Sequence, residues 1–134
     1  MAKTPTQHLA SKKAKKKVVL ERHFAGIKAG QLMLVGTPQL VDAYVRRIPA
    51  GETRSIRRLR NEMARNHRCN ATCPVSTAIF LRLVAQAALD EIEAGAELVD
   101  VAPFWRAVAP EDKLVKKLSV DADWIRFQRE RESA

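Results

Sequence analysis

The sequence predicts a single domain, mainly α with a small β hairpin, arranged like a winged helix-turn-helix. Three segments space their apolar residues as amphipathic helices do, each opens with a helix-start signal, and shorter alternating runs follow the third. The chain has 134 residues, 46% of them hydrophobic, which is enough to bury one core. We expect residues 1–17 to be a disordered basic arm, 18–36 a poorly defined lead-in and 37–132 the folded domain.

The first two predicted helices have clear starts. Thr37 precedes Pro38, so an N-cap is followed by proline at the first helical position, and the apolar spacing continues to a turn at residues 49–51. Ser55 can cap the second helix. The inward stripe of this helix consists of Ile56, Leu59 and Met63, and Arg57, Arg58, Arg60 and Arg65 lie outside it.

The third predicted helix begins after Thr72, has Pro74 in its first turn and ends at Gly95. Its expected core face consists of Ile79, Phe80, Leu83, Val84 and Ala87. The opposite face carries Ala78, Arg82 and Ala85. We interpret the acidic residues between 90 and 100 as a solvated helix end.

Short alternating runs after this helix predict a β hairpin. Residues 98–101 and 105–109 have strand character, residues 110–113 form a turn, and 114–118 return as a strand. Asp121 can cap a last short helix. Three helices followed by a hairpin is the winged helix-turn-helix order, and a generic small α+β domain is the alternative.

Basic residues are concentrated in the first half of the chain. The formal net charge is +9, and residues 29–70 hold eight arginines against three acidic residues. A concentrated positive field favours a polyanion, and arginine matches the geometry of phosphate groups. We therefore expect duplex DNA as the partner, with RNA possible; a solubilising tail and a solvated helix face are the alternative explanation.

Location and metal content follow from the same composition. No apolar run approaches the length of a membrane span, and two cysteines without an export signal indicate reduced thiols. We expect a cytoplasmic, nucleoid-associated protein with no membrane partner. His67, Cys69 and Cys73 lie close together, but a structural zinc site needs four ligands, so we expect no metal, and no motif indicates a cofactor.

Little in the sequence indicates catalysis, because no nucleotide-binding, metalloprotease or serine-hydrolase motif occurs. Cys73 lies beside the predicted start of a helix, where the helix dipole can make a thiol reactive. A small buried residue at that position is the alternative. We expect Trp105 and Trp124 to be core residues rather than platforms for stacked bases.

Several stretches, in matching order and spacing over residues 37–130, resemble the DNA-binding domain of methylated-DNA–protein-cysteine methyltransferases. Residues 48–56, IPAGETRSI, resemble the entry motif IPxGxVxTYG of that family. Residues 103–108, PFWRAV, resemble its PCHRVV active-site strand, and Trp124-Ile125 resembles its closing WLLxHE helix. The helix from Thr72 lies where that family has its recognition helix. The resemblance implies a winged helix-turn-helix that approaches duplex DNA from the minor groove and rotates a damaged base into a pocket.

The departures from that family imply lost chemistry. Phe104 stands where the alkyl-accepting cysteine would be and Trp105 where its activating histidine would be, and neither can do that work. Ala78 falls near the arginine that fills the vacated base position, with Arg82 as a substitute one turn later. The resemblance is thus to alkyltransferase-like proteins, which recognise alkylated bases without repairing them. It implies DNA-binding residues Arg57, Arg58, Arg60, Arg65, Ser76, Ala78, Arg82 and Arg106, and a pocket of Ile56, Pro103, Phe104 and Trp105.

Two other functions remain open at this point. In the first, the protein is a DNA alkyltransferase that uses Cys73 as the acceptor. In the second, it is an RNA-binding module, or a protein adaptor that uses the acidic segment 90–100, since a winged-helix fold does not fix function. The sequence gives no indication of the oligomeric state.

Overall fold

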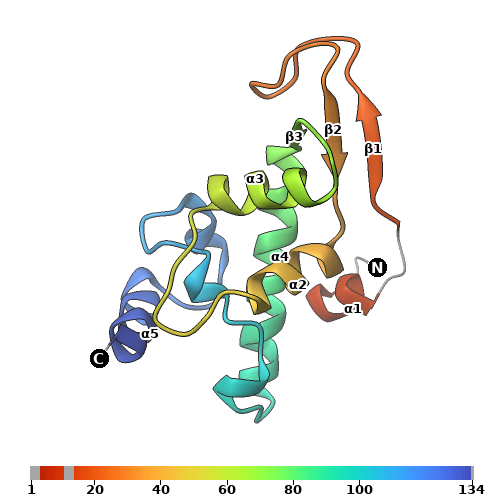
Figure 1. The fold of residues 1–134 in the computed structure, drawn as a ribbon. Helices are drawn as coiled ribbons and strands as arrows, with labels where there is room; N and C mark the ends of the chain where they lie inside the picture. The colour runs from red at the N-terminus through yellow and green to blue at the C-terminus, as the bar shows by residue number, and fades with distance from the viewer. Residues whose placement is uncertain (1–3, 11–13, 134) are drawn as a thin grey trace.

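Residues 4–10 and 14–133 are described by the computed structural model, which is mostly helical with a small three-stranded sheet (Figure 1). The α-helices are α1 Pro5–Ala10, α2 Pro38–Arg46, α3 Ile56–Asn66, α4 Pro74–Glu93 and α5 Ala122–Ser133. The strands are β1 Lys16–Val19, β2 Leu32–Val35 and β3 Ala71–Thr72. Three short 3₁₀ helices lie between α4 and α5: η1 Leu98–Asp100, η2 Phe104–Arg106 and η3 Lys113–Lys117. The predicted fold class is confirmed.

Side-chain caps fix the starts of three helices at the predicted residues. The Thr37 hydroxyl accepts a hydrogen bond from the Leu40 amide at 3.1 Å, and the Ser55 hydroxyl accepts one from the Arg58 amide at 3.0 Å. The Asp121 carboxylate accepts from the Trp124 amide at 3.0 Å. Each cap satisfies an amide that has no partner within its own helix.

Helix α4 differs from the prediction at its start and on its faces. Its N-cap is Cys73, without a side-chain cap, whereas Thr72 lies in β3 and donates its hydroxyl to the Arg60 carbonyl at 2.9 Å. Ile79, expected in the core, is 48% exposed, and Ala85, expected outside, is fully buried. The reason is that α4 packs against α1, α2, α3 and two of the 3₁₀ helices, so most of its circumference is covered and small residues are needed inside (Figure 1).

The hairpin lies between α1 and α2 instead of following the three predicted helices. β1 pairs antiparallel with β2, from Lys16 opposite Val35 to Val19 opposite Leu32. β3 then adds to β2 in parallel, so the order is β1-β2-β3. The predicted strands between residues 98 and 118 are wrong: this stretch is folded into 3₁₀ helices, whose inward residues recur often enough to resemble alternation.

The expected disordered arm and lead-in supply much of this sheet. α1 packs against α4 and α2, and the Gln39 side-chain amide donates to the carbonyls of His8 at 3.1 Å and Leu9 at 2.6 Å. Lys16 and Lys17 begin β1. The arm's Lys12 and Lys13 lie outside the described residues.

Two groups of buried residues hold the fold together. The main core joins α2, α3, α4, η2 and α5 and includes Leu59, Met63, Leu81, Val84, Phe104, Trp105 and Ile125. A smaller cluster under the hairpin contains Ile27, Met33 and Cys73, with Leu20 and Phe24 packed against it. This second cluster fixes the hairpin against the start of α4.

Candidate nucleic-acid interface

The outward face of α3 carries a cluster of cations. Arg57, Asn61 and Arg65 follow one another at four-residue intervals, so they share one side of the helix, while Leu59 and Met63 are buried on the other. Arg57 and Arg65 are exposed, as is Arg58. These residues, with Ser55 and Glu62, line a shallow hollow of about 290 Å³. The structure thus brings together three of the four arginines that the sequence predicted on this helix.

Two of these arginines have no acidic partner. Arg58 pairs with Glu62 at 3.2 Å, and Arg54 approaches the same carboxylate at 3.5 Å. Arg57 and Arg65 form no ion pair within residues 4–10 and 14–133. An exposed guanidinium without a carboxylate partner keeps its donors free for a bidentate bond to phosphate.

Arg60 occupies a different position from the other three. It is half-buried, its main-chain carbonyl accepts the Thr72 hydroxyl, and its Nε is buried without a hydrogen bond in the described part of the chain. It does not line the hollow. The prediction that Arg60 acts together with Arg57, Arg58 and Arg65 is therefore not supported by its placement.

Further cations, Lys15, Lys17 and Arg47, act on the C-terminal end of α3. Burial of His67, at the end of α3, lowers the pKa of its imidazole, and the charges of Lys15, Lys17 and Arg47 lower it further. Arg47 lies over the Tyr44 ring, 4.6 Å from its centroid. The lysine run was visible in the sequence, but only the sheet, whose β2 and β3 contact α3, brings β1 to this side of the molecule.

Residues of α4 and η3 line a second hollow, of about 210 Å³. Ala78, Ile79 and Arg82 contribute from α4, and Lys113, Leu114 and Lys117 from η3. Ala78 and Arg82 were predicted to face DNA, whereas the two lysines were not. Ser76, also predicted, is half-buried and its hydroxyl oxygen is buried without a hydrogen bond in the described residues.

Arg106 does not belong to either surface. Its Nε donates at 3.0 Å to both Glu132 carboxylate oxygens, Nη2 donates to the same carboxylate, and Nη1 donates to the Ile48 carbonyl at 2.7 Å. The side chain is 16% exposed. Its donors are thus used within the protein, and its predicted contact with DNA is corrected to a structural role.

The predicted base pocket is filled by aromatic side chains. Phe104 and Trp105 are 0% and 1% exposed, in η2 rather than in a strand. Phe104 stacks on Trp124 with ring centroids 5.5 Å apart, and Trp105 meets Trp124 edge-on at 5.9 Å. Ile56 packs against the main core, and Pro103 is buried. Phe104 and Trp105 thus pack as rings where the base pocket was expected, which confirms the prediction that Trp105 belongs to the core. Pro103 instead lines a separate hollow of about 180 Å³, together with Arg46, Leu98, Val99, Val101 and Arg106.

Cys73 is also enclosed. It is 6% exposed and packs with Ile27 and Met33 beneath the hairpin. A thiol in this position cannot meet a base without opening of the sheet. Within the described residues, no group of three His, Cys, Asp or Glu side chains is arranged to hold a metal ion.

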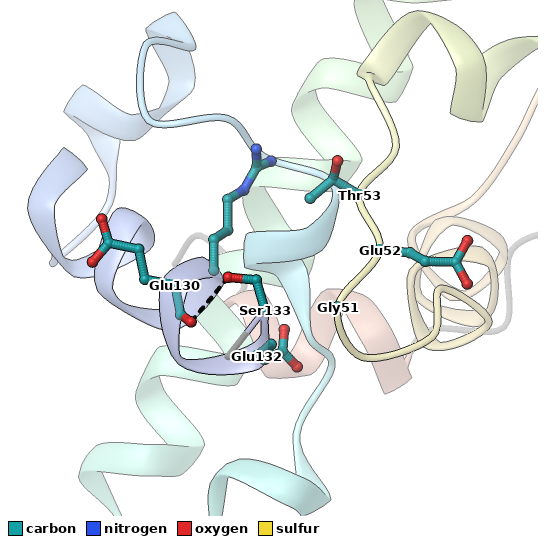
Figure 2. Close-up of a pocket in the computed structure, with 7 residues that line it drawn as sticks. Gly51, Glu52, Thr53, Glu130, Glu132 and Ser133 are labelled. Atoms are coloured by element: carbon teal, nitrogen blue, oxygen red, sulfur yellow. Dashed lines mark hydrogen bonds between the residues drawn. The ribbon is translucent and has the colours of Figure 1, made fainter.

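A further hollow, of about 220 Å³, lies between the loop at residues 51–53 and the end of α5 (Figure 2). Glu52, Glu130 and Glu132 line it. Its one arginine, Arg129, donates to the carbonyls of Trp105 at 2.6 Å and Val108 at 3.1 Å. The three carboxylates make this hollow unsuitable for phosphate.

No family model, curated protein or solved structure matches the chain. The resemblance to alkyltransferase-like proteins therefore stays a prediction. Among the described helices, none combines the length and apolar character needed to cross a membrane.

Proposed function

We propose that this protein binds duplex DNA and catalyses no reaction on it. The observation that carries the proposal is the pair of exposed arginines on α3, Arg57 and Arg65, which form no ion pair within the described residues. When such a surface binds a phosphate backbone, counterions that were condensed on the DNA are released, and this release favours binding. The proposal puts the protein in the cytoplasm, associated with the nucleoid.

In this proposal, α3 and α4 contact different parts of the duplex. Arg57, Arg58 and Arg65 of α3 hold phosphates of one strand. The face of α4 that carries the exposed Ala78 and the half-buried Arg82 approaches the groove, since a small residue permits close contact and the arginine can enter a narrow minor groove. Lys113 and Lys117 of η3 flank that face and add phosphate contacts.

The absence of catalysis in the proposal follows from the surroundings of the candidate groups. Phe104 and Trp105 offer no nucleophile and no general base, and Cys73 is buried. Rotating a base toward η2 would require displacing the stacked Phe104 and Trp124 rings. Recognition of an alkylated base is therefore proposed only where the lesion changes the groove or the stiffness of the duplex.

A titration at two salt concentrations tests the proposal. Plain duplex, duplex containing an alkylated guanine, single-stranded DNA and structured RNA are compared with the same protein. We expect duplex DNA to bind best, with a log–log salt slope near −4 to −5, as about 4–6 phosphate contacts would give. A flat salt response would contradict the proposal.

Two results of the same experiment would support the other functions instead. Tighter binding of structured RNA at fixed salt would favour the RNA-binding function. A methyl adduct on Cys73 after incubation with methylated duplex, detected by intact-mass measurement, would favour the alkyltransferase. We expect neither, and we expect Cys73→Ala to bind duplex like the wild type.

A further inference from the structure

The hairpin of β1 and β2 carries a second set of exposed cations. Between residues 14 and 31 there are five lysines or arginines and one acid, Glu21. All five cations are exposed, and none forms an ion pair within the described residues. They are Lys15, Lys16 and Lys17 at the start of β1, and Arg22 and Lys28 in the connection to β2.

The connection between the strands has a defined conformation. Phe24 and Ile27 exchange main-chain hydrogen bonds of 2.9 and 2.8 Å around Ala25 and Gly26. Both central residues have positive φ, +50° and +84°, which is the type I′ turn that matches the twist of a hairpin. Arg22 and Lys28 lie on either side of this turn, so their backbone positions are fixed.

The hairpin is also fixed relative to the helices. Ile27 and Met33 pack against Cys73 at the start of α4, and the Leu32 amide donates to the Asn70 side chain at 2.8 Å in the α3–α4 connection. In Figure 1 the hairpin projects beyond the helices on the side where β3 leads into α4, and α5 lies away from it. The cations of the hairpin therefore stand beside the predicted recognition helix at a set position.

We propose that this hairpin is a basic wing that contacts a second segment of the duplex backbone. The inference depends on the proposed function and adds a binding surface to it. Contacts of β2 and β3 with α3 bring the hairpin to the side of that helix, Lys16 and Lys17 lie on β1, and Arg22 and Lys28 extend the basic surface past the turn. Two rigid basic elements on one protein can hold the phosphates of two separated backbone segments, which fixes orientation on the duplex.

An exposed sheet edge gives a second reason for lysines. β1 is an edge strand, and edge lysines hinder pairing with another chain. That reason accounts for Lys16 and Lys17 but does not account for Arg22 and Lys28, which lie outside the strand. The experiment therefore removes the charges near the turn.

The test compares three full-length variants by duplex titration over a range of salt. Arg22→Gln with Lys28→Gln removes two charges from the wing, and Arg126→Gln with Arg131→Gln removes two exposed charges from α5 as a matched control. We expect the wing variant to bind more weakly with a salt slope shallower by about 1.8, because each phosphate contact contributes about 0.9. The α5 variant is expected to keep the wild-type slope, as is Arg22→Lys with Lys28→Arg, which keeps both charges.

Footprinting on the bound duplex gives an independent readout. Wild-type protein is expected to protect two separated backbone segments, and the wing variant to lose one of them. A further variant, Arg57→Gln with Arg65→Gln, removes the exposed charges of α3. If it weakens binding while the wing variant keeps the wild-type slope and footprint, the hairpin does not contact the duplex, and the proposed function stands. An equal loss in the α5 variant would also overturn the wing. If the wild type fails to bind duplex at all, both proposals fall.

Discussion

Arg106 and Glu132, 26 residues apart, form an ion pair that joins η2 to the end of α5. The carboxylate accepts from Nε and Nη2 on one edge of the guanidinium and from the Trp105 indole, at 2.6 Å, while Nη1 of Arg106 donates to the Ile48 carbonyl. Burial alone would raise the pKa of Glu132, but the hydrogen bonds from Arg106 and Trp105 and the positive charge of Arg106 outweigh it and hold the pKa below its ordinary value. The Arg106–Glu132 ion pair thus connects η2 with the end of α5, and Arg106 also connects η2 with the residues after α2.

We expect Arg106→Leu to destabilise the fold by about 3 kcal/mol, since removing one partner leaves an uncompensated buried charge. Urea unfolding followed by circular dichroism measures the loss. Arg126→Leu is the control, because its partner Asp123 is exposed and a surface ion pair contributes less than about 1 kcal/mol. Equal losses of unfolding free energy in the two variants would show that the buried ion pair contributes no more to stability than the exposed one.

The same pair sets a stability change in acid. A carboxylate whose folded pKa lies below its unfolded value, 4.5, stabilises the fold at pH above that value. The contribution is lost as the pH falls through the lower folded pKa. We expect Glu132→Gln to be less stable than wild type at neutral pH and the difference to shrink below pH 4.5, as measured by thermal melting across that range. A difference independent of pH would contradict this assignment.

Arg82→Ala tests whether α4 reaches the DNA. We expect duplex binding to weaken by about 1–2 kcal/mol, because the variant loses an arginine that enters the groove. Fluorescence anisotropy with a labelled duplex measures the change, and Arg126→Ala on α5 serves as the control. Normal binding by Arg82→Ala would mean that α4 is not the element that reads the duplex.

DNA binding is expected to take up a proton at His67. Burial and the charges of Lys15, Lys17 and Arg47 lower the pKa of His67 in the free protein, so the imidazole is neutral at pH 7. A phosphate placed beside these cations raises that pKa, and duplex affinity should therefore increase as the pH falls from about 7 toward the free-protein pKa. His67→Gln should remove this increase, whereas His8→Gln should keep it. A pH-independent affinity in the wild type would place the phosphate elsewhere.

Phe104→Cys tests whether restoring the acceptor restores repair chemistry. We expect no methyl adduct at position 104 by intact-mass measurement after incubation with methylated duplex. The position is 0% exposed, and the neighbouring Trp105 cannot act as general base. An adduct would show that the rings open to admit a base, and it would reinstate the pocket that the resemblance implies.

Local sequence was sufficient to predict the starts of α2, α3 and α5, but not α1 or the start of α4. Thr37, Ser55 and Asp121 act as caps where they were predicted, because capping depends on a side chain and an amide only three residues away. The arginine face of α3 follows from the same local periodicity, since Arg57 and Arg65 must lie opposite Leu59 and Met63 on any helix.

The positions of the strands, and the set of cations that share one surface, depend on contacts between residues far apart in the sequence. A strand pairs with distant residues, so Lys16 and Lys17 form an edge through pairing with β2, which their own sequence does not encode. Arg106 was assigned to DNA because PFWRAV resembles a motif of a DNA-binding family, whereas its ion pair with Glu132 depends on a contact 26 residues away. Burial and charge pairing depend on how the whole chain packs. Local patterns therefore predict helices, but they do not predict which charged side chains stay exposed and without an ion pair.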